Sequence, residues 1–277
     1  KIFAMALALA MALSLAACGS SGASSGSSAG SAASGSASGS AAGSALTTVE
    51  AGKLIMSTNA SFPPYEMVKD DGSFEGIDVD IASKIAEKLG LELEVMDMDF
   101  TAAVNAPAEG KADMCMAGLT VNDERKKNLD FSDTYANGVQ VVIVPENSDI
   151  TSVDDLANDK MIGTQEGTTG YNYCSASPED GGYGEDHVIA YTNGATAVQA
   201  LLAGKVDCVV IDSQPAQEYV KANPGLKILD TEFTNEDYAI AVAKGNTALL
   251  DAINGALNEL ISDGTVQTII DSYINAG

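Results

Sequence analysis

From Lys53 onward, short apolar runs alternate with amphipathic stretches. The run Lys53–Ser57 predicts a strand. Between Asp78 and Leu89, apolar residues recur at four-residue spacing and Gly90 follows, which predicts a helix that ends there. The pattern therefore indicates a folded region that begins near residue 52 and uses both kinds of element.

The same criteria predict further strands at Leu91–Met96, Asp113–Met116, Gln140–Val144, Met161–Gly163, Val206–Ile211 and Tyr238–Val242. They predict helices at Phe100–Glu109, Ala195–Leu202 and Pro215–Ala222, a short helix capped by Asn122, and two helices within Thr247–Asn275, broken near Asp263–Gly264. Alternation of strands and helices is typical of an α/β fold, with mostly parallel sheets.

The first residues have a different pattern. Lys1 precedes a nearly continuous apolar run from Ile2 to Ala17, which is too short for the roughly 30 Å hydrocarbon core of a bilayer. A positive charge, a short apolar run and small residues at its end predict a secretory signal peptide. Leu15-Ala16-Ala17-Cys18 also resembles the bacterial lipobox, which predicts acylation of Cys18, including palmitate; the alternative is a plain signal peptide.

Between Gly19 and Ala45 every residue is Gly, Ser or Ala. Such a segment buries too little apolar area to offset its chain entropy, so a disordered tether is predicted. The chain is therefore expected to be a globule anchored by lipid at an outer membrane face, without a span of its own.

Composition narrows the function. Lys and Arg total 14 against 39 Asp and Glu, so the net charge is −25, and nucleic acid is excluded as a partner. His187 is predicted to be a solvated residue at a strand edge, and no metal or cofactor is expected. Cys115 and Cys208 are expected to be inert core thiols, and pairing of Cys174 with Cys208 stays open.

The segment Gly76–Ala82 is the strongest motif. Acids in the first turn of a helix favour its dipole, which accounts for the local pattern. The segment also resembles the signature of the family 3 extracellular solute-binding proteins, the amino-acid receptors of ABC importers. Further segments resemble the same family in the same order: Asn59–Glu66, Gly118–Arg125, Asp130–Tyr135, Gln165–Gly170 and Gly204–Asp207 leading to Asp212.

The resemblance implies a two-lobed periplasmic-binding-protein type II fold, with two mixed sheets joined by a two-strand hinge. The implied divisions are a signal peptide at 1–17, a tether at 18–51, lobe 1 at 52–138 plus 237–277, and lobe 2 at 139–236. The hinge is expected near Gly138–Val141 and Thr234–Tyr238.

For a ligand carboxylate, Arg supplies a planar, bidentate donor, and Arg125 matches the carboxylate-binding position of the family. The alternative is a surface Arg beside Lys126 and Lys127. The resemblance also assigns the backbone of Thr169, at a helix start with Thr168, to the same carboxylate.

The resemblance implies that a ligand ammonium is bound by Asp212, the Thr120 hydroxyl and the Gly118 carbonyl. The position of Asp212 after a buried strand suits this role, because α/β folds bind ligands at carboxyl ends of strands. The alternative for Asp212 is a helix N-cap. Gly118 stands where relatives often have Ser.

For the ligand side chain, Phe62 and Phe100 match the positions that sandwich it, although Phe100 could belong to the core of its helix. Asn59 matches a position that is often Asp, so a neutral or polar ligand is slightly favoured over a cationic one. The role of Glu66 stays uncertain.

The resemblance thus implies capture of a free amino acid between two closing lobes and its delivery to an ABC permease. No enzymatic activity is expected, and a monomer is expected. The lipid anchor fits the extracellular face of a Gram-positive membrane. Two alternatives stay open: a ligand sensor for a separate receptor, and an exported cyclohexadienyl dehydratase with Glu66 or Asp212 as its acid.

Overall fold

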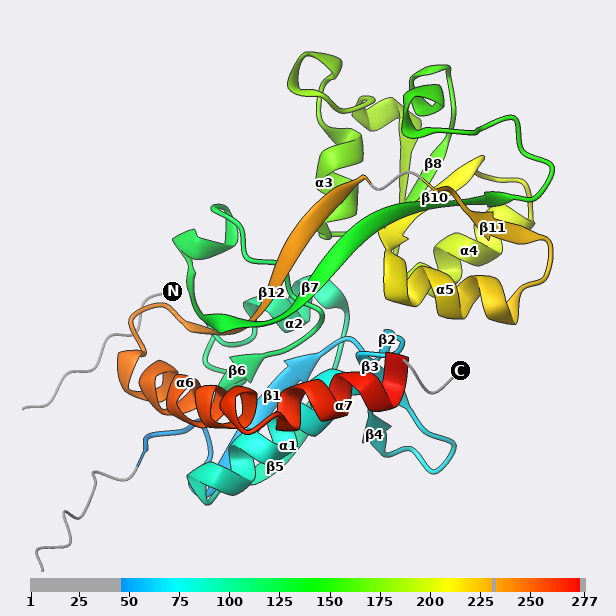
Figure 1. Cartoon of the computed structure of the whole chain (residues 1–277). Coiled ribbons are helices and arrows are strands. Elements are labelled where there is room, and N and C mark those ends of the chain that lie inside the picture. The colour runs from blue at the N-terminus through cyan, green and yellow to red at the C-terminus, as the bar shows by residue number, and fades with distance from the viewer. Residues whose placement is uncertain (1–45, 231–232, 275–277) are drawn as a thin grey trace, which may run out of the picture. The chain divides into compact units, whose positions relative to one another are not determined.

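The computed structural model describes residues 46–230 and 233–274 (Figure 1). The predicted signal peptide, Cys18 and the Gly19–Ala45 segment lie outside the described residues. Leu46 packs on the core, and the Val49 N–H donates to Asp113 at 2.7 Å. Within this part of the chain, none of the helices combines the length and the apolar character needed to cross a membrane.

The large sheet contains β1 (Lys53–Thr58), β5 (Glu92–Asp97), β6 (Met114–Cys115), β7 (Leu129–Pro145), β8 (Ile162–Gln165), β9 (Val188–Tyr191), β10 (Cys208–Asp212), β11 (Leu226–Ile228) and β12 (Thr234–Ala243). A small sheet contains β2 (Ser61–Phe62), β3 (Glu66–Val68) and β4 (Phe74–Glu75). The helices are α1 (Ile77–Leu89), α2 (Phe100–Asn105), α3 (Thr169–Ser175), α4 (Gly194–Leu202), α5 (Ser213–Ala222), α6 (Thr247–Ser262) and α7 (Thr265–Ile274). Short 3-10 helices lie at Arg125–Lys127, Val153–Ala157, Pro178–Asp180 and Glu185–His187.

The large sheet has the strand order β5-β1-β6-β12-β7-β10-β8-β9, with β11 beside β7. Each strand pair that includes β7 or β12 is antiparallel, and the other pairs of this sheet are parallel. The expectation of mostly parallel sheets is therefore wrong at the centre, because two long neighbouring strands run in opposite directions there. The sheet is mixed, as the resemblance implied.

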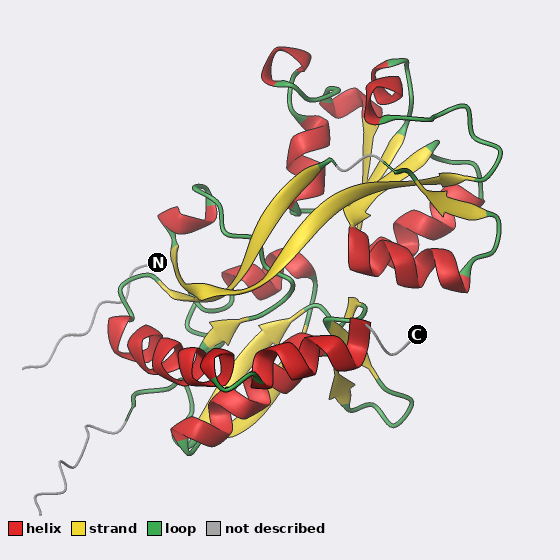
Figure 2. Ribbon diagram, in the orientation of Figure 1, coloured by secondary structure: helices red, strands yellow, loops and turns green. Residues whose placement is uncertain are grey.

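The strands β7 and β12 connect the two lobes. They run from the lobe with α1, α6 and α7 to the lobe with α3, α4 and α5 (Figures 1 and 2). β7 has 17 residues, whereas the apolar pattern predicted only its Gln140–Val144 end. That end is almost fully buried, while the first half mixes buried and exposed positions, which hid it from a search for apolar runs. The sheets of the two lobes are thus one continuous, curled sheet.

The second lobe has a core on each face of its sheet. Val141 and Ile143 of β7 belong to the main core, and Val142 and Val144 belong to a separate cluster on the other face. This division follows from the two-residue alternation of side chains along a strand.

Two cysteines lie in that separate cluster. Cys174 and Cys208 are both buried and both free, so they are not paired. Burial raises the pKa of Cys174 to about 12, and likewise raises the pKa of the Cys115 thiol to about 12. A raised pKa lowers thiolate content, which agrees with inert core thiols.

The small sheet is anchored to the start of α1. The N–H groups of Ile77 and Asp78 donate to the carbonyls of Pro64 and Tyr65, each at 3.0 Å. A Cβ at Gly76 would lie 2.1 Å from the Tyr65 carbonyl oxygen, and its φ is 133°, so only Gly fits there. The sequence did not predict these strands, because strands of two or three residues show no periodicity.

Most predicted elements are present, with shifted ends. The helix expected to reach Glu109 ends at Asn105, because Pro107 has no N–H to continue the helical ladder. His187 ends a 3-10 helix just before β9 and is half-buried. The two C-terminal helices break at Asp263–Gly264, as expected.

Candidate functional site

One pocket collects the predicted ligand-binding residues. Its lining consists of Asn59, Phe62, Glu66, Phe100, Ala117, Gly118, Thr120, Arg125, Gln165, Thr168, Thr169 and Asp212. All of the residues singled out for ligand binding in the sequence are in this set, and Glu66, Ala117 and Gln165 join them. The free space between these side chains, including its opening to solvent, is about 330 Å³. Its interior is narrow, with room for about one water molecule.

Arg125 forms one end of the pocket. Asn122 accepts a hydrogen bond from the Arg125 N–H at 2.8 Å, which fixes the start of the 3-10 helix. The guanidinium donates to the carbonyls of Thr120 at 2.7 Å and Gly167 at 3.3 Å. A guanidinium has five N–H donors, so these bonds leave others for an anion in the pocket. Burial lowers the pKa of Arg125, yet an Arg stays charged at neutral pH.

The environment of Arg125 differs from that of the two lysines after it. The Arg125 guanidinium is half-buried and stacks on the Phe100 ring, 5.4 Å from its centroid. Lys126 and Lys127 are exposed and pair with Asp123 and Glu124. Because Arg125 turns inward, the alternative of a plain surface Arg does not describe its position.

Next to Arg125, whose guanidinium bonds to the Gly167 carbonyl, α3 begins as expected. The Thr168 hydroxyl caps it by accepting from the Tyr171 N–H at 3.2 Å, and donates to the Gln165 carbonyl at 2.8 Å. Gly167 just before it has φ 76°, and a Cβ there would lie 2.4 Å from Thr101 Oγ1. The side chain of Thr169, the first residue of α3, is buried.

Asp212 forms the other charged group of the pocket. It is buried at the end of β10 and occupies the N-cap position of α5, but its side chain makes no capping hydrogen bond. Its carboxylate accepts from the Tyr238 hydroxyl and from Gln140 Nε2, the latter at 2.8 Å. Burial and the negative charge of Glu236 raise the pKa of Asp212 to about 7.

Glu236 is a site residue that the sequence did not reveal. The Thr120 hydroxyl donates to Glu236 Oε2 at 2.9 Å, and Gln140 Nε2 donates to the same oxygen at 3.1 Å. A hydroxyl has a single proton, so this bond leaves the lone pairs of Thr120 for another donor. A signal existed: Glu236 lies two residues before the buried Tyr238 on a strand, which places both on one face.

Gly118 shapes the wall next to Phe62. Its φ is 50°, and a Cβ would lie 2.6 Å from Phe62 Cε1, so a Ser at this position would collide with the ring. The Gly118 N–H donates to Asp78 Oδ2 at 2.9 Å. Phe62 therefore fills the space that a side chain at position 118 would need.

Two amide side chains in the pocket lining are bonded to one another. Asn59 Nδ2 donates to the Met98 carbonyl at 2.8 Å, and Gln165 Nε2 donates to Asn59 Oδ1 at 2.9 Å. Both side chains are buried. Gln165, at the end of β8, was not singled out in the sequence, and no pattern in its apolar strand marks it.

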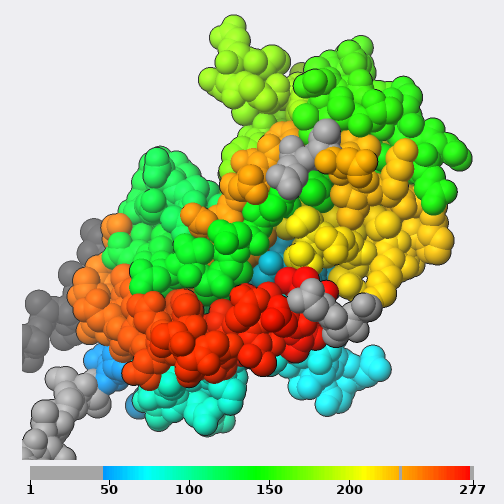
Figure 3. Space-filling view, in the orientation of Figure 1, coloured from blue at the N-terminus to red at the C-terminus, as the bar shows by residue number. Residues whose placement is uncertain are grey.

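The lobes also touch beside the pocket. The Tyr219 hydroxyl of α5 donates to the Ser61 carbonyl of β2 at 2.7 Å. In the space-filling view, blue atoms of the N-terminal part of the fold are visible between yellow α5 and the red end of α7 (Figure 3). The pocket thus lies where both lobes meet.

Comparison with known proteins agrees with this geometry. Residues 54–276 match the family model of the bacterial extracellular solute-binding proteins, family 3. A probable histidine-binding protein of Neisseria gonorrhoeae is 33% identical over 79% of this chain and 81% of its own. The arginine-binding extracellular protein ArtP of Bacillus subtilis is 33% identical over 78% of this chain and 84% of its own.

Solved structures give the same result. An ancestral arginine-binding protein bound to glutamine superposes with a TM-score of 0.74 and is 40% identical, over 80% of this chain and 97% of that one. The relatives are binding proteins, not enzymes, so the dehydratase alternative is not supported. The match over nearly the whole folded region and the two-lobed fold show that this chain belongs to the family 3 bacterial extracellular solute-binding proteins.

Proposed function

We propose that the protein binds a free amino acid between its lobes and delivers it to the permease of an ABC importer. The observation that carries this proposal is that the guanidinium of Arg125 and the carboxyl group of Asp212 line a single pocket. A free amino acid carries a carboxylate and an ammonium, and these two groups complement it. Thr169 is proposed to contact the carboxylate, and Thr120 and Gly118 the ammonium.

The proposed ligand has an uncharged, polar side chain. Asn59 and Gln165 contribute amide groups to the pocket lining, which form hydrogen bonds but carry no charge to pair with a cation. Phe62 and Phe100 supply apolar walls. The named ligands of the relatives include histidine, arginine and glutamine, and glutamine fits these amide groups best.

Binding is proposed to require opening of the lobes, because the pocket interior is too narrow to admit an amino acid. The proposed lobe boundaries, at 138/139 and 236/237, face one another: Gly138 pairs with Glu236 across β7 and β12. A ligand that contacts both lobes stabilises the closed form, since it makes both sets of contacts only there.

We further propose that Cys18 is acylated and anchors a monomeric protein to the extracellular face of a Gram-positive membrane. The support is the lipobox-like Leu15–Cys18 and the Gly/Ser/Ala segment after it. Replacement Cys18→Ser should move the protein from the membrane fraction to the culture medium, as followed by fractionation. Retention of the variant in the membrane fraction would refute the anchor.

The function is tested by calorimetry with the twenty amino acids, on the mature chain with Cys18→Ser. We expect at least one dissociation constant below roughly 100 μM, which corresponds to about −5.5 kcal/mol. If none binds in this range, the proposal fails.

The carboxylate contact is tested by Arg125→Ala, with Lys126→Ala as the matched control. We expect Arg125→Ala to abolish measurable binding, because the carboxylate would then be buried without a cation. Lys126→Ala should bind normally, since Lys126 is exposed. Unchanged affinity in Arg125→Ala, with a wild-type unfolding midpoint, would refute the assignment.

A further inference from the structure

Glu66 is a buried acid whose oxygens are not hydrogen-bonded by any N–H or O–H group of the residues that the structure describes. The whole residue is inaccessible to solvent and contributes to the pocket lining. A carboxylate in such a place would carry a large desolvation cost. Its protonation state is therefore set by its neighbours.

The backbone sets Glu66 beside Asp78. The Asp78 N–H donates a hydrogen bond to the carbonyl of Tyr65 at 3.0 Å, and Tyr65 directly precedes Glu66. Close approach at Gly76 holds the two segments together. The two buried carboxyl groups therefore extend from adjacent backbone segments, and each affects the ionisation of the other.

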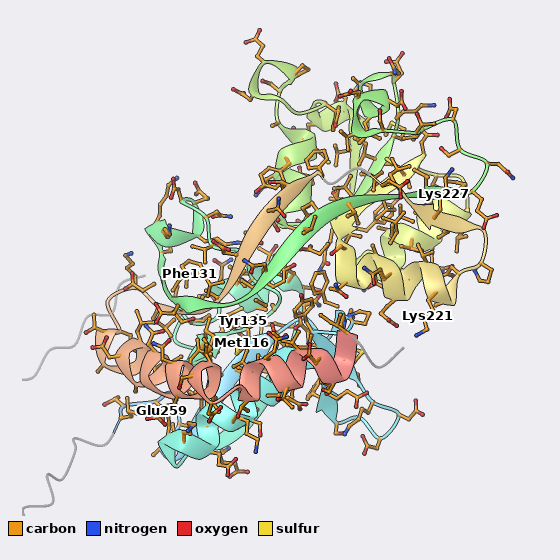
Figure 4. The ribbon with its side chains drawn as sticks, in the orientation of Figure 1. Met116, Phe131, Tyr135, Lys221, Lys227 and Glu259 are labelled. Atoms are coloured by element: carbon orange, nitrogen blue, oxygen red, sulfur yellow. The ribbon has the colours of Figure 1, made fainter. Side chains whose placement is uncertain are left out.

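The two acids differ in the donors they receive. Asp78 accepts from the Gly118 N–H at 2.9 Å and from the Tyr135 hydroxyl at 2.7 Å. Tyr135 comes from β7 and lies in the lobe that also holds Met116 (Figure 4). These bonds favour the anion at Asp78, whereas Glu66 has no comparable donors among the described residues.

The other groups near Glu66 do not compensate a second negative charge. The titratable groups that act on Glu66 from the surrounding elements are Asp78, Cys115, Asp212, Tyr65, Tyr135 and Tyr219. Arg125, the cation in the lining of the same pocket, makes no hydrogen bond to Glu66. Burial, with the negative charge of Asp78, raises the pKa of Glu66 well above its usual range.

We propose that Glu66 and Asp78 hold one proton between them. Glu66 is protonated, and its carboxyl O–H donates a hydrogen bond to the ionised carboxylate of Asp78. The pair then has one negative charge, and Asp78 receives a third hydrogen bond. Asp78 in turn holds the N–H of Gly118, so Glu66 acts as a positioning residue for the pocket wall.

This arrangement has a consequence for the ligand class, which rests on the proposed function. With Glu66 neutral, Asp212 is the carboxylate of the pocket lining that meets a ligand ammonium, opposite Arg125. The lining itself then offers one cation and one anion, with Glu236 behind it bonded to Thr120 and Gln140, and this suits a zwitterion with an uncharged side chain.

The proton is tested by infrared spectroscopy of the protein without any ligand. Spectra are recorded at about pH 8.5, above the pKa of about 7 of Asp212, so that Asp212 is ionised. We expect a carbonyl band of a buried carboxylic acid in the wild type and in Asp212→Asn. The band should be absent in Glu66→Gln and present in Glu75→Gln, a half-buried acid of the same small sheet.

Urea unfolding supplies a second readout. The amide of Glu66→Gln can donate to Asp78 as the acid does, so its stability at neutral pH should stay near that of the wild type, whereas Glu66→Ala should be clearly less stable. Absence of the band in the wild type, or its survival in Glu66→Gln, would overturn the proposal. Because no ligand is used, such a failure is distinct from a failure to bind amino acids.

Discussion

Gly118 shows how a single residue sets the pocket wall. Its backbone is in the left-handed region at φ 50°, and Phe62 occupies the place of a side chain. The sequence indicated that only the backbone of this residue is needed. The structure adds that a side chain is excluded.

Gly118→Ala should therefore be more damaging than a matched change elsewhere. Gly72 also has a positive φ, 83°, but a Cβ there meets nothing within 4 Å. We expect Gly72→Ala to cost about 1 kcal/mol of stability, from backbone strain alone. Gly118→Ala should cost about 2–4 kcal/mol, because the Phe62 ring must also move. Equal unfolding midpoints in urea for the two variants would contradict this account.

Asp212 should make binding depend on pH. Its pKa is raised to about 7, and a ligand ammonium interacts favourably with its ionised form. Affinity should consequently fall as the pH drops below about 7, approaching tenfold per pH unit. Calorimetry between about pH 5.5 and 8 measures this fall in affinity. The control variant Asp123→Asn, at an exposed acid, should show the same pH dependence as the wild type. A flat profile in the wild type would refute the role of Asp212.

The residues of the site differ in how far the sequence reveals them. Arg125 and Asp212 stood out through a family resemblance, because each is a charged group at a fixed position of a motif. Glu66, Gln140, Gln165 and Glu236 act through contacts between segments far apart in the chain, such as the 116-residue separation of the Thr120–Glu236 bond. Such partners follow only from the folded arrangement.

At the level of elements, β7 and β12 decide how the lobes are joined. They pair over most of the length of β12, from Thr234 opposite Gln140 to Ala243 opposite Leu129. The apolar pattern predicted only the buried ends of both strands, Gln140–Val144 and Tyr238–Val242. The remaining residues mix buried and exposed positions, so no apolar run marks them.

The contact between α5 and β2 should favour the closed arrangement. The Tyr219 hydroxyl donates to the Ser61 carbonyl, and water can replace both partners when the lobes separate. Because a typical hydrogen bond contributes about 1 kcal/mol net, Tyr219→Phe should weaken ligand binding by roughly fivefold. Stability should change little.

Calorimetry measures the affinity of Tyr219→Phe, and small-angle scattering without ligand should show a larger radius of gyration than for the wild type. Tyr171→Phe, at a half-buried residue of α3, is the matched control. Unchanged affinity and size for Tyr219→Phe would show that this bond does not bias closure.

For the whole molecule, buried acids should reverse the usual effect of mild acid on stability. The pKa of Asp78 is raised to about 6 and that of Asp212 to about 7, mainly by burial. An unfolded Asp has a pKa of about 3.9, so between about pH 4 and 7 the folded state binds more protons. The free energy of unfolding should therefore rise as the pH falls through this window.

We expect a gain on the order of 1–3 kcal/mol between about pH 7.5 and 5, measured by urea unfolding. Below about pH 4 the trend should reverse, because hydrogen bonds to lysines lower the pKa of Asp130 and Asp149. The net charge of −25 also favours mild acid, but salt screens that part. A gain that vanishes in about 0.5 M salt would exclude the buried acids as its cause.

By itself, the sequence determined the kinds of element, the order of most of them and the family, because periodicity and short motifs are local properties of the chain. It also predicted the residues that now line one pocket. The tertiary structure decided the continuous mixed sheet, the free state of Cys174 and Cys208, and the partners of Asp78, Thr120 and Asp212. These features depend on contacts between distant segments, and the protonation of a buried acid depends on which neighbours the fold brings to it.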